Sequence, residues 1–424
     1  MSIRTFTIGL VALSLACVAS VRADKADFKV NSDGGLAEQN YPRVAVSGDQ
    51  RFAVVWVDHR DGTPDIFMQR FDSDASPVGA NIRVNDNPSA SFQHQPSVAS
   101  DILGYYGVVW TDFRNGLYPF DPDVFYQRYD PFGAPVNTNV EITTSWPDTT
   151  KEQPDISLST WGTGIVVWAD RRNGNWDIYG QLIASDGNLI GGNFKINDDA
   201  GGAQQHAPRV SASAEGWFVV TWYDNRSGHD DVYVQRFDSL GVSLGANYRV
   251  NLDGTTKRQA YPDVATDGAG HFTVVWVDWR NGNYPVNPDI YAAKIDTNMS
   301  AVTPNLKINT DQSDRAQREV AISADRMGNV AIIWSDSGIS SWDIRGQMID
   351  VDGVVREANF AANSDPDSAQ LRADVALDGS YRYITWVDRR NGNYDIYASV
   401  TKYNDPALDI QPRLMQFSMQ RGGA

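Results

Sequence analysis

Two aspartates flank an arginine and an Asn-Gly pair in the stretch WADRRNGNWDIYGQLI, residues 168–183. Carboxylates with this spacing could bind a cation or act as an acid and base pair, and the nearby Trp176 ring could stack on a ligand. An arginine between two carboxylates can instead form a charge-assisted clasp that only stabilises a turn. The number of copies in the chain separates a single site from a repeated structural device.

The stretch recurs seven times, each time around a tryptophan. The tryptophans are Trp56, Trp110, Trp168, Trp222, Trp276, Trp334 and Trp386, at intervals of 52 to 58 residues. An aspartate follows each tryptophan by two positions: Asp58, Asp112, Asp170, Asp224, Asp278, Asp336 and Asp388. Another precedes the third strand candidate: Asp65, Asp123, Asp177, Asp231, Asp289, Asp343 and Asp395. Six copies add an arginine: Arg60, Arg114, Arg172, Arg226, Arg280 and Arg390. The repetition favours a structural clasp, and the following Asn-Gly or Asp-Gly supplies residues that tolerate positive φ.

The repeat predicts an all-β fold. Each copy contains four short strand candidates, which in the first copy lie around YPRVAV, FAVVW, DIFMQRF and NIRVN. Four strands per repeat at this interval are typical of propeller blades, so the chain is predicted to be a seven-bladed β-propeller of four-stranded antiparallel blades. The last copy stops after its third strand, whereas DFKVN at 27–31 matches the fourth strands NFKIN, NYRVN and NLKIN. The N-terminal strand is therefore predicted to complete blade seven.

The two ends of the chain fall outside the repeats. Residues 1–23 place Arg4 before a short apolar stretch and small residues near Ala23, which is typical of a secretory signal peptide. The propeller is expected at 24–405, followed by a C-terminal tail at 406–424. We expect a protein that is secreted, periplasmic or on the cell surface, without a transmembrane span. Lipoprotein cleavage before Cys17, the only cysteine, is the alternative.

Charge and composition limit the partners. The formal charge of −17 argues against a nucleic acid, which requires a basic face. Signal cleavage removes Cys17, which excludes thiolate nucleophiles and cysteine-bound metals. No cofactor is expected. Calcium at the DxRNG loops is the alternative, although the arginine stands where a ligand oxygen would be needed. We expect a monomer.

The repeat VVWVDHRDGTPDIFMQRFD and its copies resemble the TolB-type, WD40-like (PD40) propeller repeats of bacterial and archaeal periplasmic and cell-surface proteins. The similarity extends from residue 27 to about residue 403. The SPDG turn common in TolB-type repeats is absent here. The resemblance implies a non-catalytic scaffold that binds a protein or another component of the cell envelope.

One face of the predicted propeller gathers the variable residues. Loops between second and third strands emerge beside the loops into the next blade, together with six first-strand glutamines: Gln39, Gln93, Gln205, Gln259, Gln317 and Gln370. Lys151 takes the glutamine position in blade three. Ligand-binding candidates on this face are Tyr118, Phe120, Lys151, Trp176, Tyr284, Trp342 and Tyr394. Aromatic rings beside polar groups suit stacking on a sugar or anchoring a peptide, and packing between blades is the alternative for each ring.

The leading functional hypothesis is a non-catalytic module that binds an envelope or extracellular protein. A glycan-binding, lectin-like module and a secreted glycan-active hydrolase or lyase are the alternatives. No catalytic residue is chosen: the GVSLG segment at 241–245 falls in a turn, where a nucleophile elbow would need a strand followed by a helix. An enzyme would require converging carboxyl groups with perturbed titration in the central funnel.

Overall fold

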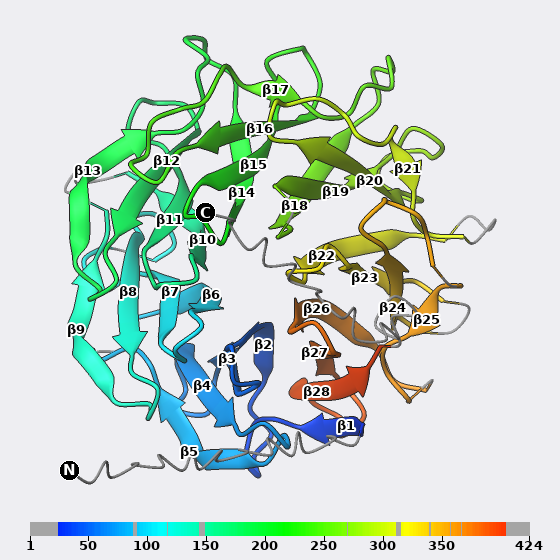
Figure 1. Cartoon of the computed structure of the whole chain (residues 1–424). Helices are drawn as coiled ribbons and strands as arrows, with labels where there is room; N and C mark the ends of the chain where they lie inside the picture. Colours follow the sequence, from blue (N-terminus) through cyan, green and yellow to red (C-terminus); the bar gives the residue numbers. More distant parts are fainter. Residues whose placement is uncertain are drawn as a thin grey trace, which may run out of the picture.

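The computed structural model describes residues 24–403, except 88–90, 117, 144–148, 269, 311–314, 339–340, 357 and 366. The predicted signal peptide and the predicted tail at 406–424 lie outside the described residues. The regular structure of the described part consists of 28 strands in seven four-stranded antiparallel sheets. The sheets stand around a central axis, which confirms the seven-bladed propeller (Figure 1). No described segment forms a helix with the length and apolarity needed to cross a membrane.

Blades one to six use their strands in chain order from the axis outward, and blade seven ends on the N-terminal strand. The first strands, which line the axis, are β2 (Gln39–Val46), β6 (Gln93–Ser100), β10 (Lys151–Leu158), β14 (Gln205–Ala212), β18 (Gln259–Thr266), β22 (Gln317–Ala324) and β26 (Gln370–Leu377). The second strands are β3 (Phe52–Asp58), β7 (Tyr106–Asp112), β11 (Gly164–Asp170), β15 (Phe218–Asp224), β19 (His271–Asp278), β23 (Val330–Asp336) and β27 (Tyr381–Asp388).

The outer half of each blade is less uniform. The third strands are β4 (Asp65–Phe71), β8 (Asp123–Tyr129), β12 (Asp177–Ile183), β16 (Asp231–Phe237), β20 (Asp289–Asp296), β24 (Asp343–Ile349) and β28 (Asp395–Lys402). The fourth strands are β5 (Pro77–Arg83), β9 (Pro135–Glu141), β13 (Leu189–Lys195), β17 (Tyr248–Arg249), β21 (Leu306–Lys307), β25 (Phe360–Ala361) and β1 (Lys25–Lys29). In blades four to six the fourth strand has only two residues, so most of the pairing within these blades is between the first three strands.

The second strands form the core because both of their faces are covered. In β3, β7 and β23 every residue is buried, and the Val, Ile and Trp side chains point alternately into the two neighbouring blades. The seven repeat tryptophans are at most 1% exposed. A near-continuous apolar run is what a strand requires when sheets stack on both of its sides.

The first strands share a bulge that the sequence did not reveal. Their third residues all adopt positive φ, between 49° and 59°, although none is glycine: Tyr41, Gln95, Gln153, Ala207, Tyr261, Glu319 and Arg372. The pairing with the second strand shifts register at the same place in all seven blades. Non-glycine residues in this conformation carry strain, and such strain concentrates at binding sites.

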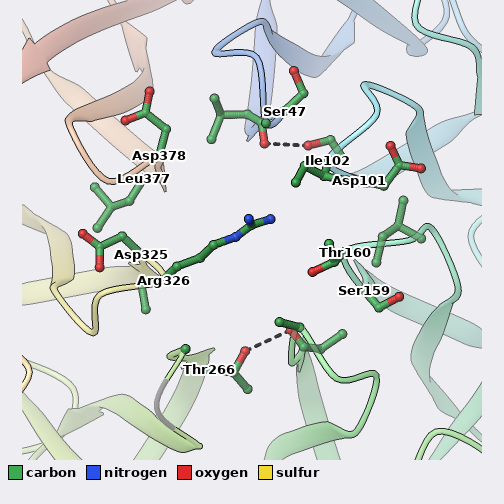
Figure 2. A pocket seen from close by; sticks show the side chains of 18 of the residues that line it. Ser47, Asp101, Ile102, Ser159, Thr160, Thr266, Asp325, Arg326, Leu377 and Asp378 are labelled. Carbon is green, nitrogen blue, oxygen red and sulfur yellow. Dashed lines mark hydrogen bonds between the residues drawn. The ribbon is translucent and has the colours of Figure 1, made fainter. Parts of the chain in front are cut away.

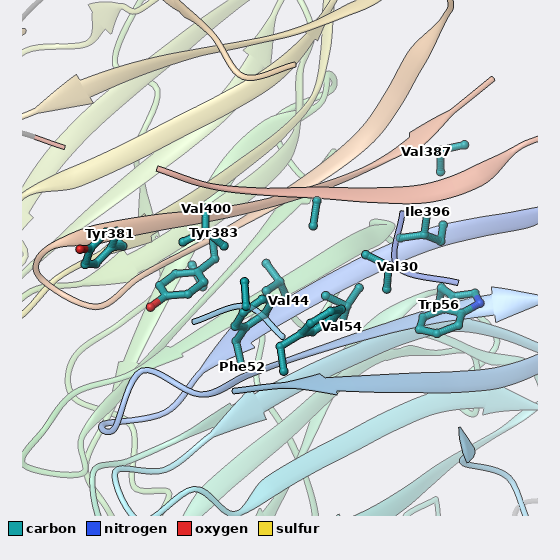
Figure 3. Close-up of a cluster of buried hydrophobic side chains, with 14 of the residues drawn as sticks. Val30, Val44, Phe52, Val54, Trp56, Tyr381, Tyr383, Val387, Ile396 and Val400 are labelled. Atoms are coloured by element: carbon teal, nitrogen blue, oxygen red, sulfur yellow. The ribbon is translucent and has the colours of Figure 1, made fainter. Parts of the chain in front are cut away.

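Blade seven is closed by the N-terminus, as predicted. Strand β1 pairs antiparallel with β28, and the Val30 amide donates to the Ile396 carbonyl at 2.8 Å. Val30 is buried in a cluster that joins blades one and seven and includes Trp56 and Tyr383 (Figure 3). The first and last blades are therefore joined by both hydrogen bonds and apolar contacts.

We predict that a chain lacking residues 24–32 is less stable than one starting at Asp24 by more than about 3 kcal/mol. The reason is that β28 is left with an unpaired edge and that the buried contacts of Val30 are lost. Chemical unfolding measures the difference. Leu36→Ala is the control, since Leu36 is 87% exposed. Equal stability of the truncated and reference chains would show that β1 does not close the ring.

Candidate ligand-binding site

The same end of every blade holds two facing aspartates. The last residue of each second strand pairs directly with the first residue of the third strand, as Asp58 pairs with Asp65 and Asp388 with Asp395. All seven blades repeat this register. Like charges opposite each other on neighbouring strands repel, and most of these carboxylates are buried. Each pair therefore needs donors.

The first aspartate is held by the tryptophan and the arginine of the repeat. In blade three, Trp168 Nε1 donates to Asp170 Oδ2 at 2.8 Å, and Arg172 donates its backbone N–H to Oδ1 and its Nη2 to Oδ2. The Arg172 guanidinium lies 4.1 Å from the centre of the Tyr179 ring. The same bonds recur in five other blades. This arrangement has the geometry of a charge-assisted clasp.

In blade seven these donors shift the pKa of the first aspartate. Burial opposes ionisation of Asp388, but the hydrogen bonds from Arg390 and Trp386 outweigh it and hold the pKa of Asp388 below its ordinary value. The carboxylate stays charged at neutral pH, as the arginine bond requires.

The second aspartate is held by an asparagine that follows the fourth strand. Asn85 donates to Asp65 at 2.6 Å and to Gln93 of the next blade at 3.3 Å, while its Oδ1 accepts the Ile66 amide. Equivalent asparagines are Asn31, Asn197, Asn251 and Asn309. The six first-strand glutamines are fully buried in these junctions, so they link neighbouring blades and do not form part of an exposed ligand face.

Lys151 occupies the same kind of junction. Its ammonium lies 3.0 Å from Asp123, and the side chain is 5% exposed. Thr143 of blade two takes the place of the asparagine and donates to Asp123 of the same blade at 3.1 Å. A threonine is too short to bridge to the next blade, and the longer lysine reaches the aspartate directly. Lys151, expected at the ligand face, is therefore omitted from the candidate site.

Blade six lacks the arginine, and its bonds differ accordingly. Within the described residues, the buried Trp334 Nε1 has no hydrogen-bond partner. Asp336 accepts from Gln317 at 3.3 Å and from the Gly338 amide. The tryptophan bond and the arginine bond are thus lost together.

The turn glycines fall into two groups. Gly62, Gly174, Gly228 and Gly392 have φ between 91° and 94°, the conformation expected of a turn glycine that follows aspartate, asparagine or, in the case of Gly228, serine. Gly116 and Gly282, in the longer loops of blades two and five, instead make room for a backbone carbonyl, which would lie about 2 Å from an added Cβ.

The predicted aromatic candidates lie in different surroundings. Tyr118 and Phe120 are 52% and 69% exposed in the blade-two loop, where Tyr118 stacks on Phe92 at 4.2 Å. Trp176 is half-buried beside His206, and Tyr394 is half-buried against the cluster of blades one and seven. Trp342 is half-buried, 6.0 Å from the Arg318 guanidinium. Tyr284 is 60% exposed.

Tyr284 alone among these candidates lines a cavity at this end of the axis, which we call the arginine–tyrosine funnel. Its volume is about 440 Å³. Its wall includes the aromatic residues Tyr41, Tyr261, Trp279 and Tyr284 and the arginines Arg43, Arg209, Arg258, Arg318 and Arg372. Five of the seven bulge residues contribute to this wall, so the strained backbone of the first strands shapes the funnel.

Arg258 organises the aromatic side of the funnel. Its guanidinium lies 4.9 to 5.6 Å from the centres of four rings, those of Tyr223, Tyr261, Trp279 and Tyr284. Asp230 Oδ2 holds this guanidinium through an ion pair with Arg258 Nε at 2.7 Å. Tyr261 and Tyr284 are 48% and 60% exposed, so their rings remain accessible.

Donors outnumber acceptors on the rest of the wall. Arg209 and Arg318 donate to the backbone carbonyls of Pro208 and Pro285, and neither forms an ion pair with a described residue. Arg318 Nε and the indole N–H of Trp279 are buried and have no partner in the described part of the chain. Unpaired buried donors are uncommon, and these two lie beneath the surface of the wall.

Below the funnel, the axial channel holds three aspartates that tie neighbouring blades together. Asp155 accepts the Val210 amide at 2.9 Å, Asp263 the Ile322 amide at 3.2 Å, and Asp374 the Val44 amide at 2.8 Å. Each bond crosses from one first strand to the next. Arg43 and Arg209 line both the funnel and this channel, so the two spaces are continuous.

The channel raises the pKa of two of these carboxyl groups. Burial is the main cause of the raised pKa of Asp263 and of Asp374, because the surrounding protein removes most of the water that would stabilise the charged carboxylate. The pKa of Asp263 rises to about 7, where Arg209 opposes the rise and Asp155 and Asp374 add to it. Asp263 is therefore partly protonated near neutral pH.

The opposite end of the axis opens into a second cavity of about 360 Å³, which has different chemistry (Figure 2). Arg326 reaches into this opening, and Asp101, Asp325 and Asp378 stand around it. These aspartates accept backbone amides of their own turns, as Asp101 does from Leu103 at 2.9 Å. No aromatic side chain is among the described residues lining this end, so the funnel is the stronger candidate.

The fold and the funnel define a seven-bladed propeller with a concave site on its axis. No family model matches the sequence, and no curated protein matches it significantly. The TolB-type likeness therefore remains a resemblance between repeats.

Solved structures of similar fold include a Penicillium chrysogenum α-L-arabinanase complexed with arabinobiose, at 13% identity and a TM-score of 0.53, covering 90% of this chain and 98% of that one. A Fusarium graminearum α-L-arabinofuranosidase with arabinobiose gives 11% identity, a TM-score of 0.54 and coverage of 89% and 98%. An ulvan lyase, which is a polysaccharide lyase, has 10% sequence identity and a TM-score of 0.56, and the match covers 88% of this chain and 95% of that one. At these identities the likeness concerns the fold.

For the clasp, we predict that Arg172→Met lowers the free energy of unfolding by about 3 kcal/mol, because Asp170 is left buried without its cation. Adding Asp170→Asn should recover at least about 1 kcal/mol of this loss, since the unpaired charge is removed. Urea unfolding of the single and double variants measures both effects. The neighbouring exposed Arg171→Met is the control. A double variant no more stable than Arg172→Met would contradict the clasp.

For the channel, we predict that the wild-type chain loses stability relative to Asp263→Asn as pH rises from about 4 to 8. The folded-state pKa of about 7 exceeds the ordinary 3.8, so the folded chain holds a proton that the unfolded chain releases between these values. Unfolding free energies across this range test the difference, with exposed Asp352→Asn as control. Parallel profiles for wild type and Asp263→Asn would be the contrary result.

Proposed function

We propose that this protein binds a glycan in the arginine–tyrosine funnel. The observation that carries the proposal is the pairing of accessible Tyr261 and Tyr284 rings with the arginine side chains of the same wall. Sugar rings present apolar C–H faces that stack on aromatic rings, and their hydroxyl oxygens accept hydrogen bonds from arginine N–H groups.

The shape of the site favours a glycan over the protein partner suggested by the sequence. A cavity of about 440 Å³ falls within the range of small-ligand sites, whereas a protein partner needs a broad patch with a buried apolar centre. The similar structures named above add support, because two hold arabinobiose and the ulvan lyase is also known bound to -[GlcA(1-4)Rha3S]-. The predicted signal peptide would bring such a site to glycans outside the cytoplasm.

Glycan cleavage is a second candidate function, favoured by one observation. Asp263 lies in the channel continuous with the funnel, and a carboxyl with a pKa near 7 suits a general acid at neutral pH. Its two carboxyl oxygens also accept hydrogen bonds from the Val264 and Ile322 amides, so the same side chain stabilises the first strands of blades five and six. Shortening of a bound oligosaccharide, lost in Asp263→Asn, would distinguish cleavage from binding.

We predict that Tyr261→Ala and Tyr284→Ala each weaken oligosaccharide binding by about 3- to 10-fold, because each removes a stacking ring. A panel of plant and algal oligosaccharides, measured by calorimetry, tests this. Tyr118→Ala is the matched control: Tyr118 precedes a proline in the equivalent loop of blade two, is 52% exposed, and lies outside the funnel wall.

Melting temperatures of the three variants should stay close to that of the parent chain, since all three rings are at least 48% exposed. Binding lost equally in Tyr118→Ala would move the site away from the funnel. A chain that binds no member of the panel would contradict the proposed function.

A further inference from the structure

The charge of the funnel is opposite to that of the whole protein. The chain carries a formal charge of −17. The funnel wall carries five arginines against one glutamate, Glu319. A cluster of positive charge kept in a strongly acidic protein focuses the local field on an anion.

Several of these arginines are compensated by neighbours. Asp230 pairs with Arg258 at 2.7 Å, Glu319 lies 3.8 Å from Arg372, and Asp374 lies 3.8 Å from Arg43. Arg209 and Arg318 differ, because their hydrogen bonds in the described part of the chain go to backbone carbonyls, which carry no net charge. Arg209 also acts on Asp263, where it opposes the rise in pKa, so its charge is partly shared, whereas Arg318 forms no ion pair with a described residue.

The positions of these two arginines in the repeat show how the funnel departs from it. Arg209 follows the first-strand proline of blade four, where blades three, five and seven have Asp155, Asp263 and Asp374. Arg318 follows the buried glutamine of blade six, where the equivalent residues include His94 and Ala260. Neither arginine is part of the repeated clasp, so clasp formation does not explain them.

Resting on the glycan-binding function proposed above, we infer that the ligand is an anionic glycan, with a carboxylate or sulfate group bound by Arg209 and Arg318 while an adjoining sugar ring stacks on Tyr261 or Tyr284. Guanidinium groups bind carboxylate and sulfate oxygens through charge-assisted hydrogen bonds. The aromatic rings favour a saccharide over an acidic peptide, because sugar faces stack on them.

The test uses matched pairs of oligosaccharides that differ only in charge. Hexameric oligogalacturonate is compared with its methyl ester, and a sulfated galactan oligosaccharide with its desulfated form. Calorimetry on the mature chain should show at least about 10-fold tighter binding of one charged member, weakening as salt is raised. Which pair responds identifies the carboxylate or the sulfate as the recognised group.

Variants assign the effect to the funnel. Arg209→Gln and Arg318→Gln should each remove most of the preference for the charged member. Arg326→Gln, at the opposite axial opening, is the matched control and should keep it. Binding of the neutral and charged members with equal affinity would overturn the inference and leave the glycan-binding function standing. Binding of polyglutamate in place of every oligosaccharide would overturn both.

Discussion

Two aspartates that face each other at one end of every blade, most of them buried, are the constraint on which the rest of the structure depends. Neither charge is tolerable without donors, and the repeat supplies them from three strands and from the adjacent blade. Trp168 and Arg172 hold the first carboxylate of blade three. An asparagine after the fourth strand holds the second and reaches the next blade in most junctions. The hydrogen bonds that stabilise the carboxylates within a blade and those that join neighbouring blades therefore belong to one network.

This network leaves the top of the first strand free to vary. The six first-strand glutamines, and Lys151 in blade three, are committed to junctions, but the bulged residue two positions later is not. Its positive φ accompanies a place on the funnel wall in five blades, where the residue is Tyr41, Ala207, Tyr261, Glu319 or Arg372. A rigid, repeated frame thus presents a set of non-repeated side chains around one axis, which is the arrangement that a selective binding site needs.

The fold could be read from the sequence because the clasp residues recur at a fixed interval and the apolar runs between them have strand length. Closure by the N-terminal strand could be read from the likeness of DFKVN to the fourth strands. The site was harder. The exposed ring of Tyr284 was identified from its loop insertion, whereas Arg209 and Arg318 carried no signal in a pattern dominated by repeated arginines. The bulge was missed because tyrosine, glutamine and alanine give no indication of positive φ.

Lys151 shows the opposite case. Its departure from the glutamine pattern suggested a functional residue, but the accompanying change to Thr143 explains it as a local compensation within the junction. A substitution in a repeat needs to be compared with its spatial neighbours before a function is assigned to it, and a single sequence shows those neighbours only after the fold is known.

The most direct measurement of the central claim is a crystal structure of the chain from Asp24 onward with an acidic oligosaccharide bound. The account predicts density in the funnel, with an anionic group within hydrogen-bond distance of Arg209 or Arg318 and a sugar ring against Tyr261 or Tyr284. Density at the Arg326 opening or beside the Tyr118 loop, with the funnel empty, would contradict it.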